Sequence, residues 1–230
     1  MKNLTREVPQ EKLDKRLYQS MKYVTDADVK DKVILDIGCG YGWCELNFLK
    51  RGAKKVVGIE ITEEDLKTVK KNIKDKRAEF KVGDATNLKF PKESFDTIVC
   101  WEVLEHIPLK TEHQMFAQIH KVLKPGGILY LSTPYNDFLS TIMDPAWWVV
   151  RHRHYSKDDI KEYAKKNSFE LVDIHVRGGR WVSAELLNMY IAKWIFRREP
   201  FFKDTFSKHV EKEYKQKNGT FDIFAKLKKV

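Results

Sequence analysis

Cysteine is scarce in this sequence: Cys39, Cys44 and Cys100 are the only three among 230 residues. Their odd number and the lack of zinc-like spacing exclude a disulfide framework and favour reduced, buried thiols. Long apolar runs are also missing, so no segment has the length that crosses a bilayer. The first twenty residues are polar and charged and lack the apolar core of a signal peptide. We therefore expect a cytoplasmic protein.

Acidic residues are also comparatively few: Asp and Glu number 33, against 43 Lys and Arg. The basic excess is uneven: residues 1–150 hold 24 basic and 22 acidic side chains, whereas residues 151–230 hold 19 and 11. This distribution fits either a solvated surface or attraction of an anionic acceptor or membrane face. Hydrophobic residues make up 42% of the chain, enough for one sizeable core in a single domain.

What the sequence does contain is a glycine-rich turn directly after a short apolar run. Residues 33–37 have the composition of a buried parallel strand, and Gly38, Gly40 and Gly42 follow at alternate positions. Glycines remove the Cβ atoms from a strand-to-helix turn, so a ligand can lie against the backbone there. Asp36 stands at the end of this strand, where a carboxylate suits a cationic ligand better than a phosphate.

A second acidic side chain ends the next apolar run. Glu60 follows Gly42 by eighteen residues, and an acid at the tip of the second strand commonly binds the hydroxyls of a ribose. The G-x-G-x-G spacing lacks the third glycine of the dinucleotide-binding motif, and Asp36 would repel a pyrophosphate. The combination of D-x-G-x-G-x-G with a downstream acid resembles the class I S-adenosylmethionine (SAM)-dependent methyltransferases.

Further blocks match this family in its order along the chain and together cover residues 30–135. They are similar to the family's adenine-binding turn (80–85), its fourth strand (95–101), the Glu-x-x-Glu-His segment after it (102–106) and the turn before its fifth strand (123–127). Within the family, the chain is similar to the ubiquinone and menaquinone type of methyltransferase.

Alternating strand-like and helix-like patterns predict an α/β fold. The resemblance implies a seven-stranded, mostly parallel, doubly wound Rossmann-like sheet with an antiparallel last strand. We expect one domain over residues 1–230, with a cofactor-binding core at 30–135 and aromatic-rich acceptor-side insertions and the last strands at 136–220. Strands are expected at 33–37, 55–60, 79–82, 96–101, 127–133, 169–176 and 221–227, and helices at 12–23, 43–51, 63–75, 111–123 and 156–166.

The resemblance also implies SAM as the cofactor, S-adenosylhomocysteine as its product, and residues that bind both. The glycine turn and Asp36 would contact the amino-acid part, Glu60 the ribose, and Asp84 and Ala85 the adenine. For Asp84 a purely structural role in a turn is the alternative. The implied cofactor-binding set is Asp36, Gly38, Cys39, Gly40, Gly42, Glu60, Ile61, Asp84, Ala85, Trp101 and Glu102.

The Glu-x-x-Glu-His segment has two interpretations. In ubiquinone-type O-methyltransferases and small-RNA 3′-terminal 2′-O-methyltransferases the similar segment holds a divalent cation, and Glu102, Glu105, His106 and His154 would be the ligands here. Many relatives carry the segment without a metal. We favour this second interpretation, with no metal site, His106 as a base or acceptor contact, and His154 and Tyr155 as further catalytic candidates. Simple packing is the alternative for Tyr155 and His154.

Two aromatic-rich segments, residues 134–155 and 177–220, fall at the carboxyl edge of the predicted sheet, where ligands bind in open α/β folds. We expect them to select the acceptor. Residues 183–198 form a broad apolar helix, for which core or lid packing is the simplest interpretation and membrane-surface docking or dimerisation the alternative. The basic residues expected near an acid group of the acceptor are Arg151, Arg153, Arg177 and Arg180.

The sequence therefore predicts an enzyme that transfers a methyl group from SAM to a small-molecule or lipid- or sugar-linked acceptor, most simply on oxygen. We expect this acceptor to be anionic or amphipathic. A metal-assisted RNA ribose 2′-O-methyltransferase is a second hypothesis, which the lack of an RNA-binding motif disfavours. A non-catalytic SAM-fold partner protein is a third, which the intact cofactor motif disfavours.

Overall fold

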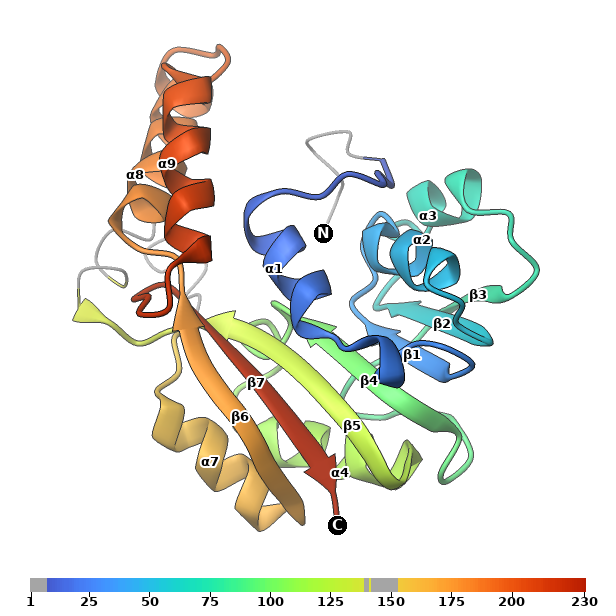
Figure 1. The fold of residues 1–230 in the computed structure, drawn as a ribbon. Coiled ribbons are helices and arrows are strands. Elements are labelled where there is room, and N and C mark those ends of the chain that lie inside the picture. Colours follow the sequence, from blue (N-terminus) through green and yellow to red (C-terminus); the bar gives the residue numbers. More distant parts are fainter. Residues whose placement is uncertain (1–7, 139–140, 142–152) are drawn as a thin grey trace.

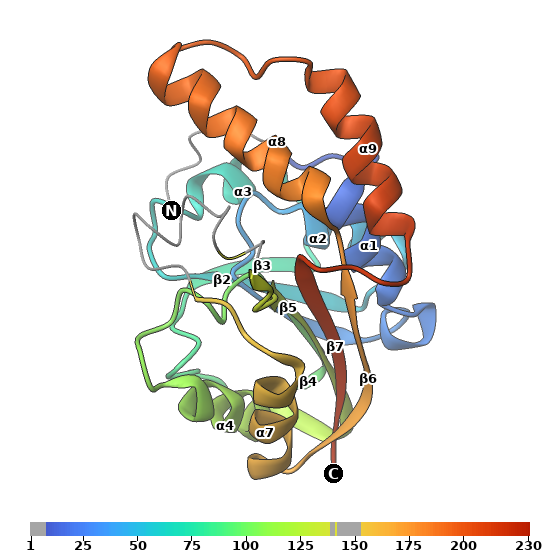
Figure 2. The ribbon, with the colours of Figure 1, turned by 90° about the vertical axis from the view of Figure 1, so that its left-hand side faces the viewer.

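The computed structural model describes residues 8–138, 141 and 153–230, and it shows a twisted sheet with helices on both faces (Figures 1 and 2). The strands are β1 (Val33–Ile37), β2 (Lys55–Glu60), β3 (Ala78–Val82), β4 (Phe95–Trp101), β5 (Leu123–Pro134), β6 (Phe169–Arg177) and β7 (Asp222–Lys229). The helical elements are α1 (Lys15–Tyr23), η1 (Asp26–Asp28), α2 (Trp43–Lys50), α3 (Lys67–Asn72), α4 (Glu112–Val122), α7 (Lys157–Lys166), α8 (Arg180–Tyr190), the π-helical η2 (Ile191–Ile195) and α9 (Lys203–Lys215).

The strand order across the sheet is β3-β2-β1-β4-β5-β7-β6. Strands β1 to β5 pair in parallel, and β7 pairs antiparallel with both β5 and β6. The direction of β7 follows from its connection. The α8–α9 hairpin leaves the carboxyl end of β6 and returns to the same edge of the sheet, so β7 must run back down (Figure 1). The predicted α/β class, the seven strands and the antiparallel last strand are confirmed.

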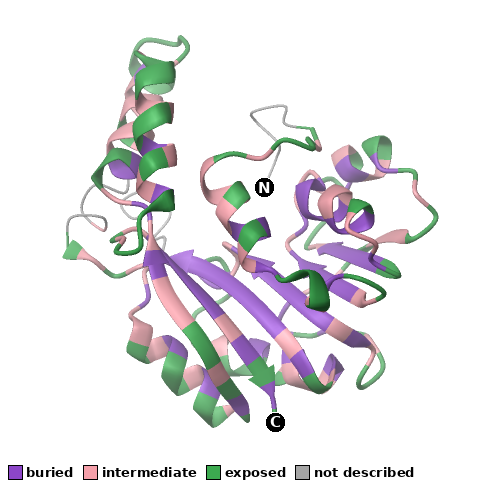
Figure 3. Cartoon of the chain, viewed as in Figure 1, coloured by how far each residue is buried: buried purple, intermediate pink, exposed green. Residues whose placement is uncertain are grey.

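Two apolar cores lie on the two faces of the sheet, whose central strands are almost wholly buried (Figure 3). Successive side chains of a strand point to opposite faces, so Leu35 belongs to the core under α4 and α7, and Ile34 belongs to the core under α1, α2, α3 and α9. Both faces of β1 and β2 are therefore apolar. This is why these strands appeared in the sequence as continuous hydrophobic runs.

Local signals placed some elements better than others. Strands β1 and β2 have the predicted bounds, and the three cysteines are buried and unbridged as expected. The helix predicted at 63–75 is shorter, because Thr62 caps a separate turn: its Oγ1 accepts a hydrogen bond from the Asp65 N–H at 3.3 Å, and α3 begins only at Lys67. Helix α9 was not predicted.

The α8–α9 hairpin projects from the sheet and ends far from the C-terminus (Figures 1 and 2). Its base is fixed by Glu213 of α9, whose carboxylate accepts hydrogen bonds from the N–H groups of Trp181 and Val182 at the start of α8. Among the residues that the structure describes, no helix combines the length and the apolar character needed to cross a membrane.

Candidate cofactor and acceptor site

The glycine turn after β1 is tied to the end of β2 by backbone hydrogen bonds. The N–H groups of Gly38 and Cys39 both donate to the Ile59 carbonyl, at 2.9 and 3.1 Å. All three glycines have positive φ, which is strained for other residues. A Cβ on Gly38 would lie 2.5 Å from the Val103 side chain, whereas a Cβ on Gly40 would meet nothing within 4 Å. Gly40 therefore faces open space, as a ligand-binding backbone must.

Glu60 closes the turn from the opposite side. The Gly40 N–H donates to its Oε1 at 2.7 Å, so the carboxylate lies at the open part of the turn. Burial raises the pKa of Glu60, although the Gly40 hydrogen bond acts in the other direction. Two other residues of the predicted cofactor-binding set, Cys39 and Trp101, have side chains that are buried in the apolar core beneath the turn. A ligand in the turn would meet Cys39 through its backbone.

Behind the turn lies a buried pair of carboxyl groups, Asp36 and Glu45, of which only Asp36 was predicted. Asp36 is 1% exposed and Glu45 is fully buried. Among the described residues, Asp36 Oδ1 and both Glu45 oxygens have no hydrogen-bond partner. Burial, followed by repulsion between the two groups, raises the pKa of Glu45 well above its usual range, and burial likewise raises the pKa of Asp36.

Gly58 of β2 makes room for this pair. A Cβ on Gly58 would lie 2.5 Å from Glu45 Oε1 and 2.9 Å from the Cys39 side chain. A glycine within a central strand weakens the strand, so it indicates a close approach by another group. The sequence offered two features from which the buried position of Glu45 could have been predicted: a glycine within β2, and an acidic residue among the apolar residues of α2.

These features fit SAM, whose amino-acid part carries an ammonium group beside a sulfonium. One buried acceptor atom, Asp36 Oδ1, has no hydrogen-bond partner among the described residues and so suits a cationic donor, because a buried polar atom without a partner is costly. The open face of Gly40 leaves space for the ligand against the backbone. Glu60 lies where the two ribose hydroxyls of such a ligand could donate to it.

A cavity of about 310 Å³ lies beyond the ends of β2 and β3, and its lining begins at Ile61, the residue after Glu60. Ile61 and Val82, both more than half exposed, supply apolar walls of the kind that pack on an adenine ring. Asp84 lines the cavity but also stabilises its own turn, since its Oδ1 accepts hydrogen bonds from the N–H and the hydroxyl of Thr86 at 2.7 and 2.8 Å. Ala85 is buried in the core and does not line the cavity.

Glu102 begins the loop that follows β4, and it adopts a left-handed backbone with φ of +55°. Its N–H donates to the Ser132 carbonyl at 3.0 Å, and its Oε1 accepts a hydrogen bond from the Ser132 hydroxyl. Arg16 of α1 lies 3.4 Å from the same carboxylate oxygen. The N-terminal helix α1 therefore borders the site. A strained backbone held by several partners is common where a ligand is bound.

Glu105 and His106 differ in burial although their side chains are neighbours. Glu105 is buried, accepts a hydrogen bond from the Thr133 hydroxyl at 3.0 Å, and has a pKa raised well above its usual range by burial and then by Glu102. The His106 side chain is 41% exposed, with its Nε2 3.9 Å from Glu105 Oε1. Of the two, only His106 is accessible to an acceptor.

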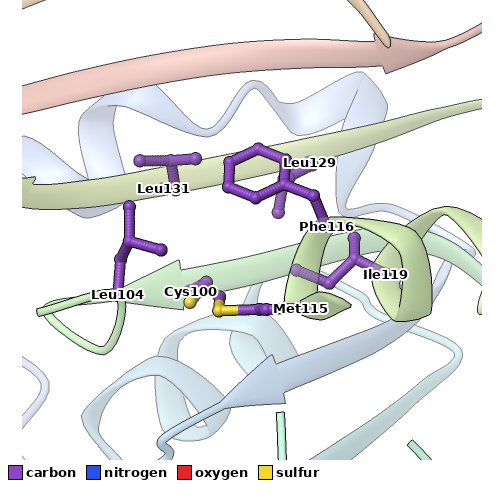
Figure 4. A pocket seen from close by; sticks show the side chains of 7 residues that line it. All are labelled: Cys100, Leu104, Met115, Phe116, Ile119, Leu129 and Leu131. Atoms are coloured by element: carbon purple, nitrogen blue, oxygen red, sulfur yellow. The ribbon is translucent and has the colours of Figure 1, made fainter. Parts of the chain in front are cut away.

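Beneath this loop, β4, β5 and α4 pack without a usable cavity (Figure 4). Leu104 inserts among side chains of these elements, and the space left between them is too small to hold a water molecule. The loop 102–107 therefore packs on closely packed apolar side chains. The lining residues are Cys100, Leu104, Met115, Phe116, Ile119, Leu129 and Leu131.

Arg153 and Tyr155 hold the loop from outside. Arg153 donates to the backbone carbonyls of Leu104, Glu105 and Ile107 and pairs with Glu112 at 2.5 Å. The expectation that Arg153 is available to an acid group of the acceptor is wrong, because its guanidinium is already engaged. Arg151 lies outside the described residues.

The Tyr155 hydroxyl is also buried and already hydrogen-bonded within the protein. It donates to the Leu104 carbonyl at 3.1 Å and lies 3.2 Å from Glu112, and burial raises its pKa. His154 differs, since its Nδ1 lies 3.1 Å from the Tyr135 carbonyl beside the end of β5. The buried, hydrogen-bonded Tyr155 hydroxyl is compatible with the packing alternative, and His154 stays a catalytic candidate.

The four residues of the metal hypothesis are not gathered around one point. Glu102 faces Ser132 and Arg16, and Glu105 faces Thr133. Within residues 8–138, 141 and 153–230, no three side chains of the metal-ligating types are placed to hold an ion.

Comparison with known proteins agrees with this site. Residues 34–127 match a family model described as a methyltransferase domain. A ubiquinone biosynthesis O-methyltransferase of Neisseria meningitidis is 32% identical over 113 residues, which cover 46% of each chain. This chain thus spans about half the length of the curated relatives it matches.

Solved structures share the fold over nearly the whole chain. A SAM-dependent methyltransferase from Mesorhizobium loti superposes with a TM-score of 0.66 at 15% identity, covering 91% of this chain and 95% of that one. A putative methyltransferase from Bacillus halodurans gives 0.66 at 21% identity, covering 93% and 98%. Residues 34–127 therefore match a methyltransferase domain, and the described chain has the fold of the SAM-dependent methyltransferases.

Proposed function

We propose that this protein transfers a methyl group from SAM to an oxygen of a small-molecule or lipid- or sugar-linked acceptor. The observation that carries the proposal is the turn at Gly40, which is open to a ligand and bordered by Glu60 and by the unpartnered acceptor atom of Asp36. Similarity to O-methyltransferases of ubiquinone biosynthesis supports oxygen as the methylated atom.

Each part of the site then has a task. When bound, SAM supplies an electrophilic methyl group. Asp36 orients the ammonium group of the amino-acid part, and Glu60 accepts hydrogen bonds from the ribose. The loop 102–107, fixed by Arg153 and by the apolar base beneath it, keeps its geometry during turnover, since small displacements of reacting groups are costly.

His106 is our candidate for the general base. It is exposed at the end of the same loop, and imidazole can take the proton of an acceptor hydroxyl at its ring nitrogen. Residues 136–220 would form the acceptor side of one domain. His154 would contribute from the segment beside β5.

The experiment that tests this proposal is a screen of purified protein with labelled SAM against phenolic, lipid-linked and sugar-linked hydroxyl acceptors. The expected result is label transfer to at least one class, with none when Gly40 is replaced by valine. Absence of SAM binding at millimolar concentration would overturn the proposal.

The role of His106 predicts a particular pH dependence. Activity is expected to fall as pH is lowered through about 6–7, where imidazoles ordinarily protonate and can no longer accept a proton. His106→Gln is expected to lower kcat about 100-fold, in the range that general base catalysis contributes, with little change in SAM affinity.

His113→Gln, on an exposed histidine of α4, is the matched control and should retain activity. Measurements with and without a chelator separate this prediction from metal assistance. Loss of activity that a chelator causes and a divalent cation reverses would contradict the base role.

A further inference from the structure

The tip of the α8–α9 hairpin exposes large apolar side chains to solvent. Trp194, Ile195, Phe196 and Phe202 are 63, 70, 57 and 78% exposed, and we call these four residues the apolar tip. They lie at the end of the hairpin that projects farthest from the sheet (Figures 1 and 2). Four such side chains together differ from the isolated apolar residues found on most surfaces.

The turn that presents the apolar tip is internally braced. Asn188 of α8 donates to the Phe201 carbonyl at 2.6 Å and accepts from the Phe201 N–H at 3.2 Å. Phe201 packs edge-on against Phe196, and the Arg198 guanidinium lies 4.4 Å from the centre of the Phe201 ring. These contacts fix the chain between η2 and α9, so the apolar tip is held outward by the fold.

Basic side chains surround the apolar tip. Within residues 193–204, Lys193, Arg197, Arg198 and Lys203 are exposed and are opposed only by Glu199 and Asp204, which gives a net charge of +2. Aromatic and aliphatic side chains flanked by Lys and Arg suit the headgroup region of an anionic bilayer, where the rings enter the interface and the cations meet lipid phosphates. A second copy of the chain would bring another basic tip, which this charge opposes.

We propose that the apolar tip docks the protein on the surface of an anionic phospholipid bilayer. The hairpin rises from the edge of the sheet at which β4, β5 and β6 end, the same edge that carries Gly40 and Glu102 (Figure 1). Docking would therefore bring the bilayer to the side of the sheet that carries the candidate site. Binding requires neither SAM nor an acceptor, so its test is independent of the proposed methyl transfer.

The test is co-sedimentation of the full chain with vesicles of phosphatidylcholine alone and of phosphatidylcholine with roughly one-third phosphatidylglycerol. The expected result is binding to the anionic vesicles that weakens as salt is raised. Combined Trp194→Ala and Phe202→Ala replacement should lower the apparent partition coefficient at least about tenfold, because the interfacial side chains are lost. Lys193→Gln with Arg197→Gln should lower binding to anionic vesicles and leave the binding to neutral vesicles unchanged.

Leu109→Ala is the matched control, since Leu109 is 72% exposed on the loop before α4, away from the hairpin. It should bind as the wild type does, and the thermal midpoints of all variants should agree. Equal vesicle binding by the wild type and the Trp194/Phe202 variant would overturn the proposal, as would no binding to anionic vesicles. Lipid-free self-association that this variant abolishes would assign the tip to a second copy instead and would also overturn it.

Discussion

Replacing Gly40 with valine is expected to lower the affinity for SAM at least about 100-fold, which corresponds to about 2.7 kcal/mol. Gly40 has φ of +54°, and its Cβ position is open to the space that a bound cofactor would occupy. A branched side chain there would fill this space. It would also strain the turn whose N–H reaches Glu60 at 2.7 Å. Calorimetry on the folded variant measures the loss.

Gly52 provides a matched control for the strain. It also has a positive φ, +85°, and a Cβ there would meet only Lys30, at 3.7 Å. Gly52→Val should therefore lose a similar amount of stability, about 1–2 kcal/mol for a left-handed residue, and keep its affinity for SAM. If both variants bind SAM as the wild type does, the glycine turn is not the cofactor cradle. If both lose it equally, the effect of Gly40→Val is unfolding.

The contrast between Gly40 and Gly58 shows which features of the site could be predicted. Gly40 belongs to a local pattern, strand, turn and helix, whose chemistry depends on a few consecutive residues, so the motif placed it correctly. The purpose of Gly58 depends on Glu45, which lies thirteen positions away and meets it only after α2 packs on the sheet. A sequence shows the unusual glycine but not the group that needs the space.

The acceptor side was predicted less well for the same reason. Arg153 was expected to bind the acceptor because basic residues cluster in its part of the chain. The structure instead uses it to satisfy three carbonyls of the loop 102–107. Helix α9 was missed because its buried side chains, Val210 and Tyr214, are few and stand among many charged residues. The role of Arg153 and the position of α9 both depend on contacts between residues far apart in the sequence, and such contacts produce no local sequence pattern.

The buried pair of Asp36 and Glu45 is expected to make stability depend on pH. Because burial raises both pKa values, the folded protein retains a proton that the unfolded chain releases. The stability that this proton contributes is fully present below about pH 4, the pKa of a carboxyl group in the unfolded chain. It is lost as pH rises through the pKa in the folded protein, which for Asp36 is about 7. Because the folded protein retains the proton and the unfolded chain does not, the free energy of unfolding should fall by a few kcal/mol between pH 5 and 7, at roughly 1.4 kcal/mol per pH unit for one proton.

Glu45→Gln isolates the pair from other titrating groups. Glu60 and Glu105 also have raised pKa values, and His120 and His175 have lowered ones, so the total slope mixes opposing contributions. The amide of glutamine keeps the shape of Glu45 and can donate to Asp36. Denaturation of the wild type and the variant between pH 5 and 7 should therefore show converging stabilities at low pH and a growing advantage of the variant toward pH 7. Glu63→Gln, on an exposed side chain, should follow the wild type. Parallel curves for wild type and Glu45→Gln would contradict a proton retained by this carboxyl pair.

The same pair should couple cofactor binding to proton release. Asp36 and Glu45 are surrounded by further acidic groups, Glu60 and the thiols of Cys39 and Cys44, and burial raises the pKa of each thiol too. A cation placed beside Asp36 favours the ionised carboxylate, so SAM should lower the pKa of the pair and release up to about one proton near pH 6. Calorimetry at pH 6 in two buffers with different ionisation enthalpies measures this release directly. Glu45→Gln should bind SAM with a smaller release, since the variant holds one titrating carboxyl fewer. Equal binding heats in both buffers for the wild type would show that SAM binding releases no net proton, and the linkage would then be absent.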